Sequence, residues 1–181
     1  GKIYDAVVVG GGPAGATAAE DLARLGRSVL LLDKAGRIKP CGGAIPPRLI
    51  REFRIPDYLL VARARSARMI SPSERRVDMP IDGGFVGMVD REVFDEYLRD
   101  RAALAGAERR TGSFTAVTRD PGGVATVHYA AADGAGMART RAVIGADGAI
   151  SAVARQEVPG SDRMRCVFAY HEIVRSPREG A

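Results

Sequence analysis

Residues 3–33 read IYDAVVVGGGPAGATAAEDLARLGRSVLLLD, and this stretch decides the fold. The apolar, β-branched run at 3–9 is typical of a buried parallel strand. The small and apolar residues of 16–25, followed by Gly26, predict a helix that ends at the glycine. A second apolar run at 28–32 predicts another buried strand. The stretch is therefore a predicted βαβ unit with a right-handed crossover.

The turn between the first strand and the helix carries the spacing G-x-G-x-x-G. This pattern is weak alone, but here it follows a strand, opens a helix and precedes an acidic residue at the next strand end. Gly10 allows a sharp turn, Gly12 lets a pyrophosphate approach the backbone, and Gly15 lets the helix pack close to the strand. The helix N-terminus, with Pro13 and Ala14, would present N–H groups and its positive dipole end to the phosphates.

Asp33 closes the second predicted strand, 18 residues after Gly15. A carboxylate at this place accepts hydrogen bonds from a ribose hydroxyl in dinucleotide-binding folds. The alternative is a solvated acid at a strand end, followed by the charged Lys34. The motif favours ribose binding, and both Asp33 and Lys34 belong to the predicted cofactor site. An acid here favours a ribose with free hydroxyls, as in FAD or NAD, over NADP.

A second candidate motif lies in residues 142–155, AVIGADGAISAVAR, where an apolar run leads into Asp147 and Gly148. It resembles the Asp-Gly motif of flavoproteins with the p-hydroxybenzoate hydroxylase fold, with the arginine at 155 shifted by one residue. In that group a second strand-turn-helix brings the aspartate near the nucleotide, so the resemblance favours FAD over NAD. The alternative is an aspartate near a helix cap, which is common.

A helix over 91–105 is predicted between the two motifs, with Asp90 as its N-cap and Gly106 after its end. In the flavoproteins that the chain resembles, an arginine of this middle helix reaches the flavin, so the resemblance makes Arg91 a cofactor-binding candidate. The alternative is a surface arginine in the first turn of a helix.

The remaining elements are predicted to be strands. Turn residues divide 66–89 into short antiparallel strands, and further strands are expected at 113–118, 124–130 and 164–174. Cys166, in the last of these strands, is expected in the core. We expect residues 1–158 to form an FAD-binding domain, with the strands of 66–89 joining the sheet of a substrate-binding domain that begins at 159–181.

Composition excludes several classes of protein. The net charge is +5 and the pI is near 9.6, but the arginines are scattered and there is no Trp, which favours a solvated surface over a nucleic-acid interface. Attraction to anionic lipid or to phosphate-bearing substrates stays open. No apolar window approaches a membrane span. Cys41 and Cys166 have no ligand-like spacing to each other or to His128 and His171, so we expect no metal site and a reduced, cytoplasmic compartment.

A narrower resemblance covers nearly the whole chain. It is carried by YDAVVVGGGPAGATAAEDLARLG, GRIKPCGGAIPPRLI, ARMISPS, GFVGMVDREVFDEYLRDRA and VIGADGAISAVA. These segments are similar to the geranylgeranyl reductases of chlorophyll and bacteriochlorophyll synthesis. The fold class that this implies is α/β: a Rossmann-like FAD-binding domain with an antiparallel β insertion, part of a longer two-domain flavoprotein. Members of the family continue to a third flavin motif with Gly-Asp, which is not found in these residues.

The resemblance also implies an activity. The family reduces the double bonds of a geranylgeranyl chain to give phytyl, using FAD and NADPH. The substrate is the free isoprenoid diphosphate or the same chain esterified to the (bacterio)chlorophyll pigment. Association with the photosynthetic membrane as a peripheral protein, and with chlorophyll-synthesis proteins, would follow.

The loop at 39–46, KPCGGAIP, has a lone thiol and two glycines between prolines. By resemblance it lies beside the flavin, which makes Cys41, Gly42, Gly43 and Ala44 cofactor-binding candidates. Glycines would let the backbone pass the ring without a side chain in the way. An isolated alkene needs a proton as well as a hydride, so Cys41 is also the catalytic candidate, as a proton donor or a small apolar wall. The alternative is a buried cysteine that packs as a small hydrophobe.

Two other functions stay open at this point. An aromatic monooxygenase would use the same fold, although the KPCGGAIP loop speaks against it. A non-catalytic fragment that binds a nucleotide or a partner protein is the other, and the missing third motif is its support.

Overall fold

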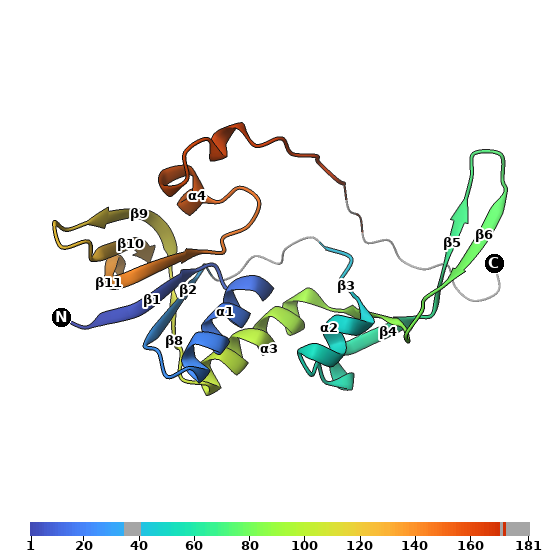
Figure 1. The fold of residues 1–181 in the computed structure, drawn as a ribbon, viewed down its shortest axis with the longest axis horizontal. Coiled ribbons are helices and arrows are strands. Elements are labelled where there is room, and N and C mark those ends of the chain that lie inside the picture. The colour runs from blue at the N-terminus through green and yellow to red at the C-terminus, as the bar shows by residue number, and fades with distance from the viewer. Residues whose placement is uncertain (35–40, 171, 173–181) are drawn as a thin grey trace. The chain divides into compact units, whose positions relative to one another are not determined.

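The computed structural model describes residues 1–34, 41–170 and 172 (Figure 1). They form two units. The first contains residues 1–34 and 94–164, and the second contains residues 41–93 with the described residues from 165 on. The domain boundary expected at residue 158 stays a prediction. Within the described part of the chain, no helix is both long and apolar enough to cross a membrane.

A six-stranded sheet forms the first unit, in the order β8-β2-β1-β11-β10-β9. Its parallel strands are β8 (Glu108–Thr111), β2 (Val29–Asp33), β1 (Ile3–Val9) and β11 (Gly134–Gly145). Its antiparallel strands are β10 (Ala125–Ala131) and β9 (Ser113–Arg119). The predicted βαβ unit and the two strands predicted at 113–118 and 124–130 are confirmed, whereas β8 had not been predicted.

Small residues bring α1 (Pro13–Arg24) close to the sheet. Its buried face is Gly15, Ala16, Ala19, Glu20 and Ala23. The absence of large side chains on this face shortens the distance between helix and strand, as the Gly15 position predicts. The predicted α/β fold class is thus confirmed at its first crossover.

The middle helix, α3 (Arg91–Leu104), begins where the sequence predicts. The Glu92 N–H donates to Asp90 Oδ1 at 3.0 Å, which confirms Asp90 as the cap. The helix buries Phe94, Leu98 and Ala102. Spacings of four residues place these three side chains on one face.

A buried carboxylate joins α1 to α3. Glu20 is 3% exposed, and its Oε1 accepts from Arg24 Nη2 at 2.8 Å and from Arg101 Nη2 at 2.9 Å. A carboxylate at this depth is tolerated only when cations and hydrogen bonds compensate its lost hydration. The two arginines supply that compensation, one from each helix.

The second unit contains two small antiparallel sheets. One is three-stranded, in the order β3 (Ala44–Ile45), β7 (Val86–Val89), β4 (Leu60–Ala64), and the other is the hairpin of β5 (Ser66–Ile70) and β6 (Arg76–Pro80). Helix α2 (Pro47–Glu52) and a short 3₁₀ turn (Asp57–Leu59) complete the unit. The antiparallel strands predicted within 66–89 are confirmed, and their membership of a substrate-domain sheet stays a prediction.

The strand predicted at 164–174 is wrong for the residues that can be described. Residues 164–170 have no regular secondary structure, and Val167 and Phe168 are 97% and 93% exposed. Cys166 is exposed and not part of the core. An apolar run predicts a strand only when another strand supplies its hydrogen bonds, and no strand of the described residues pairs with this segment. His171 lies outside the described residues.

Charged and phenolic side chains form a hydrogen-bonded cluster around Glu108 and Arg110 of β8. Glu108 accepts hydrogen bonds from Tyr4, Arg110 and Lys2, and Arg110 Nη1 donates to Tyr129 Oη at 2.8 Å. The Tyr4 hydroxyl, followed by Lys2 and Arg110, lowers the pKa of Glu108 to about 2. The charged form is thus favoured by folding.

This shift predicts acid sensitivity at Glu108. The pKa is lower in the folded state than its ordinary value near 4.5, so the stabilisation is fully present above pH 4.5 and is lost as the pH falls toward 2. We expect Glu108→Gln to reduce the free energy of unfolding at pH 7 and to make its decline between pH 4.5 and 2 shallower. Urea unfolding at a series of pH values measures both. Equal pH slopes in the variant and the parent would contradict the assignment.

Candidate functional site

Four parallel strands, β8, β2, β1 and β11, end at the same edge of the first sheet, and backbone hydrogen bonds join their ends. Gly10 N donates to Leu32 O at 2.8 Å, Ala146 N to Val9 O at 2.8 Å, and Gly112 N to Asp33 O at 2.9 Å. Ligands of open α/β sheets bind outside the carboxyl ends of the strands. The G-x-G-x-x-G turn of residues 10–15, here called the fingerprint turn, therefore meets Asp33 and the segment after β11 where a nucleotide would bind.

Two of the fingerprint glycines are required by packing. Gly10 has φ +105°, and a side chain there would collide with the backbone of Ala146. A β-carbon on Gly15 would overlap the carbonyl oxygen of Gly10. These contacts place the start of α1 directly against the end of β1, as predicted for Gly15.

Gly12 is different, because none of the residues that the structure describes fills the space beside it. Its φ of −72° suits any residue, and a β-carbon there would have no heavy atom within 4 Å. The fold alone therefore does not require glycine at this position. An open space beside the backbone at a helix start is what an approaching pyrophosphate needs. The residues present thus fit the phosphates of a dinucleotide.

The start of α1 also offers free donors. Gly12 is the N-cap and has no side chain to cap the helix, Pro13 follows at the first helical position, and the first intrahelical bond runs from Ala16 N to Gly12 O at 2.9 Å. The N–H groups of Ala14 and Gly15 have no acceptor inside the helix. These N–H groups lie at the positive end of the helix dipole, and both features favour binding of an anion at the start of α1.

Asp33 lies beside this turn. Its Oδ1 accepts from Gly11 N at 2.9 Å, and its Oδ2 accepts from Arg99 Nη1 at 3.2 Å. The side chain is 27% exposed, so it is held in place and still reachable. Lys34, the next residue, is exposed. Contact of either residue with a ribose stays a prediction.

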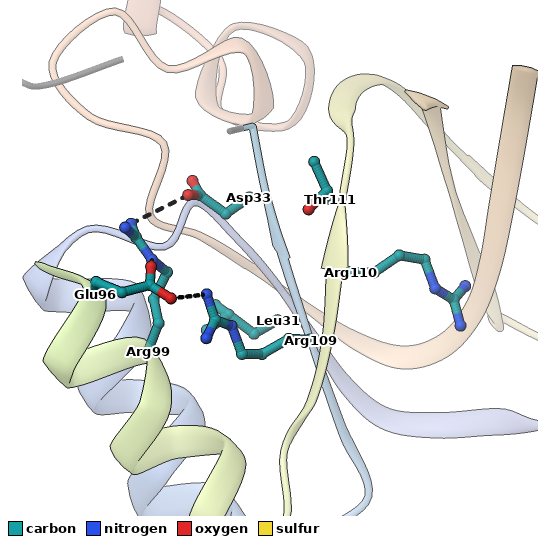
Figure 2. Close-up of a pocket in the computed structure, with 7 residues that line it drawn as sticks. All are labelled: Leu31, Asp33, Glu96, Arg99, Arg109, Arg110 and Thr111. Atoms are coloured by element: carbon teal, nitrogen blue, oxygen red, sulfur yellow. Dashed lines mark hydrogen bonds and ion pairs between the residues drawn. The ribbon is translucent and has the colours of Figure 1, made fainter. Parts of the chain in front are cut away.

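Arg99 is a site residue that the sequence did not indicate. It comes from α3, and the same Nη1 that contacts Asp33 also donates to Gly11 O at 3.0 Å. Figure 2 shows Arg99 and Asp33 turned toward each other, with Glu96 and Arg109 beside them. The predicted arginine of this helix was Arg91, two turns earlier. Only the fold shows that Arg99 lies over the fingerprint turn.

A cavity of about 280 Å³ opens next to this pair. It is lined by Leu31, Asp33, Glu96, Arg99, Arg109, Arg110 and Thr111. Glu96 bridges the two arginines, accepting from Arg109 Nη2 at 2.8 Å and from Arg99 Nε at 2.8 Å. Its pKa is lowered by Arg109 first and by Arg99 in addition. The carboxylate is therefore charged and orients both guanidinium groups.

Asp147 caps a helix in this structure. Its Oδ2 accepts from Ala152 N at 2.7 Å and Val153 N at 3.2 Å, and its Oδ1 accepts from the Ser151 hydroxyl. These donors belong to the start of α4 (Ala152–Glu157). The alternative of an aspartate near a helix cap is thus observed. Gly148, the following residue, is exposed with φ +93°. Contact of Asp147 and Gly148 with a cofactor stays a prediction.

The other candidates belong to the second unit. Cys41 is exposed, and its Sγ accepts from Gly43 N at 3.5 Å. Gly43 has φ +70°, and a side chain there would overlap Val89 O, so local packing explains this glycine. Gly42 is exposed, and Ala44 of β3 pairs with Met88 of β7. Lys39 and Pro40 of the same loop lie outside the described residues.

Arg91 is half-buried at the first position of α3, within the second unit. The structure therefore brings together the predicted residues of the fingerprint turn, Asp33 and the Asp147 segment. It does not establish a common site for these residues and for Cys41, Gly42, Gly43, Ala44 and Arg91. Their contact with the flavin stays a prediction.

The sequence matches the FAD binding domain family over residues 3–166. The chain belongs to this family. It is 63% identical over 175 residues to a geranylgeranyl diphosphate reductase of Rhodobacter capsulatus, covering 96% of this chain and 44% of the relative. It is 41% identical to a chloroplastic geranylgeranyl diphosphate reductase of Oryza sativa, covering 98% of this chain and 41% of the relative.

Among solved structures, the FAD-binding domain is similar to a geranylgeranyl bacteriochlorophyll reductase-like protein of Thermoplasma acidophilum. The TM-score is 0.71 at 28% identity, covering 81% of this chain and 40% of that one. The fold class, the resemblance to geranylgeranyl reductases and FAD as the cofactor are confirmed, whereas the residues that contact FAD stay a prediction. The chain spans less than half the length of these relatives.

The contrast between Gly12 and Gly15 predicts opposite effects of the same substitution. Gly12→Ala enters open space, so it should leave the melting temperature unchanged and weaken FAD binding by hindering the phosphates. Gly15→Ala should lower the melting temperature, because its methyl group overlaps Gly10 O. Thermal unfolding without cofactor and titration of flavin fluorescence separate the two. Equal FAD affinity in Gly12→Ala and the parent would contradict the assignment of the open space.

Proposed function

We propose that this chain is part of an oxidoreductase that uses FAD and NADPH to reduce the double bonds of a geranylgeranyl group to phytyl. The 63% identity to a geranylgeranyl diphosphate reductase across almost the whole chain carries this proposal. A dinucleotide site with an open space at Gly12 and an anchored Asp33 supports its cofactor.

In this proposal, different residues of the first unit bind different parts of FAD. The N–H groups of Ala14 and Gly15 at the start of α1 would hold the pyrophosphate, and Gly12 would leave room for it. The Asp33 carboxylate would accept from the adenosine ribose. FAD, when bound, would supply the hydride-transfer chemistry between NADPH and the substrate.

The substrate chemistry explains the proposed role of Cys41. A carbon–carbon double bond without a neighbouring carbonyl has no group that can take up charge. A proton must therefore reach one carbon as the hydride reaches the other. Cys41 lies exposed in the loop before β3, and its sulfur accepts from Gly43 N–H. In this proposal the Cys41 thiol delivers the proton, and Arg91 together with Gly42 to Ala44 forms the wall beside the flavin.

The substrate is a free isoprenoid diphosphate or a geranylgeranyl chain esterified to a (bacterio)chlorophyll. One relative is named for the diphosphate, and a structural neighbour is named for the bacteriochlorophyll. We further propose a cytoplasmic protein that binds the surface of the photosynthetic membrane and works with other proteins of chlorophyll synthesis. The chloroplastic name of the rice relative supports a photosynthetic setting.

The complete protein tests this proposal. Purified enzyme is incubated with FAD, NADPH and either geranylgeranyl diphosphate or geranylgeranyl bacteriochlorophyll without oxygen. Mass spectrometry should show product masses that rise by two hydrogens at each reduction, matched by NADPH consumption. Oxygen-dependent addition of a hydroxyl to an aromatic compound would instead identify a monooxygenase. Retained FAD without turnover of any substrate would identify a non-catalytic nucleotide-binding protein.

The role of Cys41 predicts a selective loss of activity. Cys41→Ala should slow reduction of the double bond about 100-fold, in the range of a lost general acid. Reduction of the flavin by NADPH should keep its rate, because that step needs no proton from the thiol. Stopped-flow spectra and product analysis separate the two steps. Cys166→Ala, at the other exposed cysteine, is the matched control. Unchanged product formation in Cys41→Ala would remove Cys41 from the mechanism.

A further inference from the structure

Arg99 connects three parts of the first unit that are far apart in the sequence. It lies on α3, and its Nη1 reaches both the Gly11 carbonyl at 3.0 Å and Asp33 Oδ2 at 3.2 Å. Its side chain is only 20% exposed. One guanidinium nitrogen thus joins the middle helix, the fingerprint turn and the end of β2.

Both backbone polar groups of Gly11 are hydrogen-bonded to side chains. Gly11 N donates to Asp33 Oδ1 at 2.9 Å while Gly11 O accepts from Arg99. A β-carbon on Gly11 would lie 2.8 Å from Asp33 Cγ and 3.0 Å from Arg99 Cδ. The turn, the carboxylate and the guanidinium therefore form one closed ring of hydrogen bonds in close contact.

Arg99 is itself oriented by its neighbours. Glu96, one turn earlier on α3, accepts from Arg99 Nε at 2.8 Å. Arg109 on β8 donates to the other oxygen of Glu96 at 2.8 Å and to Asp100 Oδ1 at 2.6 Å. Because Nε is taken up by Glu96, the fork of the guanidinium can turn only its outer nitrogens toward Asp33. β8 thus fixes the direction from which Arg99 approaches.

We propose that Arg99 is a positioning residue for the nucleotide: it holds the Asp33 carboxylate and the Gly11 peptide in the arrangement that the adenosine ribose requires. This inference rests on the FAD site described above. Arg99 takes one acceptor position of Oδ2 and Gly11 takes one of Oδ1, while an ionised carboxylate offers about four. Asp33 lines the cavity, and the acceptor positions that Gly11 and Arg99 do not use would accept from ribose hydroxyls.

The test compares ligands that differ in one ribose hydroxyl. Arg99→Met removes the guanidinium and keeps much of the stem, and Arg119→Met removes an ion pair with Glu157 away from the turn as the matched control. Affinities for FAD, ADP and 2′-deoxy-ADP are measured by calorimetry. We expect Arg99→Met to weaken FAD about tenfold. The preference for ADP over 2′-deoxy-ADP should disappear with it. An unchanged preference in Arg99→Met would overturn the proposal.

A second readout needs no ligand. In the ligand-free protein, amide hydrogen exchange at Gly11 should accelerate in Arg99→Met and stay as in the parent in Arg119→Met. Arg99→Lys should recover only part of the loss, because a lysine cannot replace the planar fork held by Glu96. If the parent binds neither FAD nor ADP, the nucleotide site fails, and Gly11 exchange alone decides the role of Arg99. Equal Gly11 exchange in Arg99→Met and the parent would then contradict it.

Discussion

The nucleotide site depends on the close contact between Gly15 and the carbonyl of Gly10. A side chain on Gly15 would overlap that oxygen, so α1 can start where it does only with glycine. This contact places the helix N-terminus over the end of β1. The neighbouring strands follow, because Gly10 N bonds to the end of β2 and Ala146 N bonds to Val9 at the end of β1. The start of α1 and two acidic residues, Asp33 and Asp147, are thereby gathered at one edge of the sheet.

The charged side chains then fasten the middle helix on two sides. Arg99 reaches the fingerprint turn, and Arg101 reaches the buried Glu20 on α1. Residues two apart on a helix point in different directions, so the two arginines hold α3 from different faces. Since Glu20 is almost fully buried, loss of Arg101 would leave a poorly compensated charge there, whereas Arg99 acts at a partly open site. The Arg101 contact therefore serves stability, and the Arg99 contact serves the geometry of the fingerprint turn.

Local patterns were sufficient for the elements that contact their sequence neighbours. The βαβ unit over 3–33 and the Asp90 cap follow from periodicity, glycine spacing and side-chain capping, which act within a few residues. Arg99 could not be predicted in this way, because its partners lie 66 and 88 residues away in the sequence. The local pattern does not distinguish it from the other charged residues of the helix. The strand predicted at 164–174 was wrong for residues 164–170 because the local pattern was present but, among the described residues, its pairing partner was not. The apolar run resembles a strand, but strand formation depends on a partner that the pattern does not contain.

The two acids that the motifs single out differ in how much of their carboxylate remains available. Asp147 accepts from two backbone amides and the Ser151 hydroxyl, all at the start of α4. Among the residues that the structure describes, Asp33 accepts from one donor on each oxygen, which leaves about half of its acceptor positions unused. Asp147 is therefore suited to fixing the path of its own loop beside the end of β1. Asp33 is suited to receiving a ligand, because it combines a fixed orientation with unused acceptor capacity. The same residue type thus serves the site in two ways, and the number of donors around each carboxylate distinguishes them.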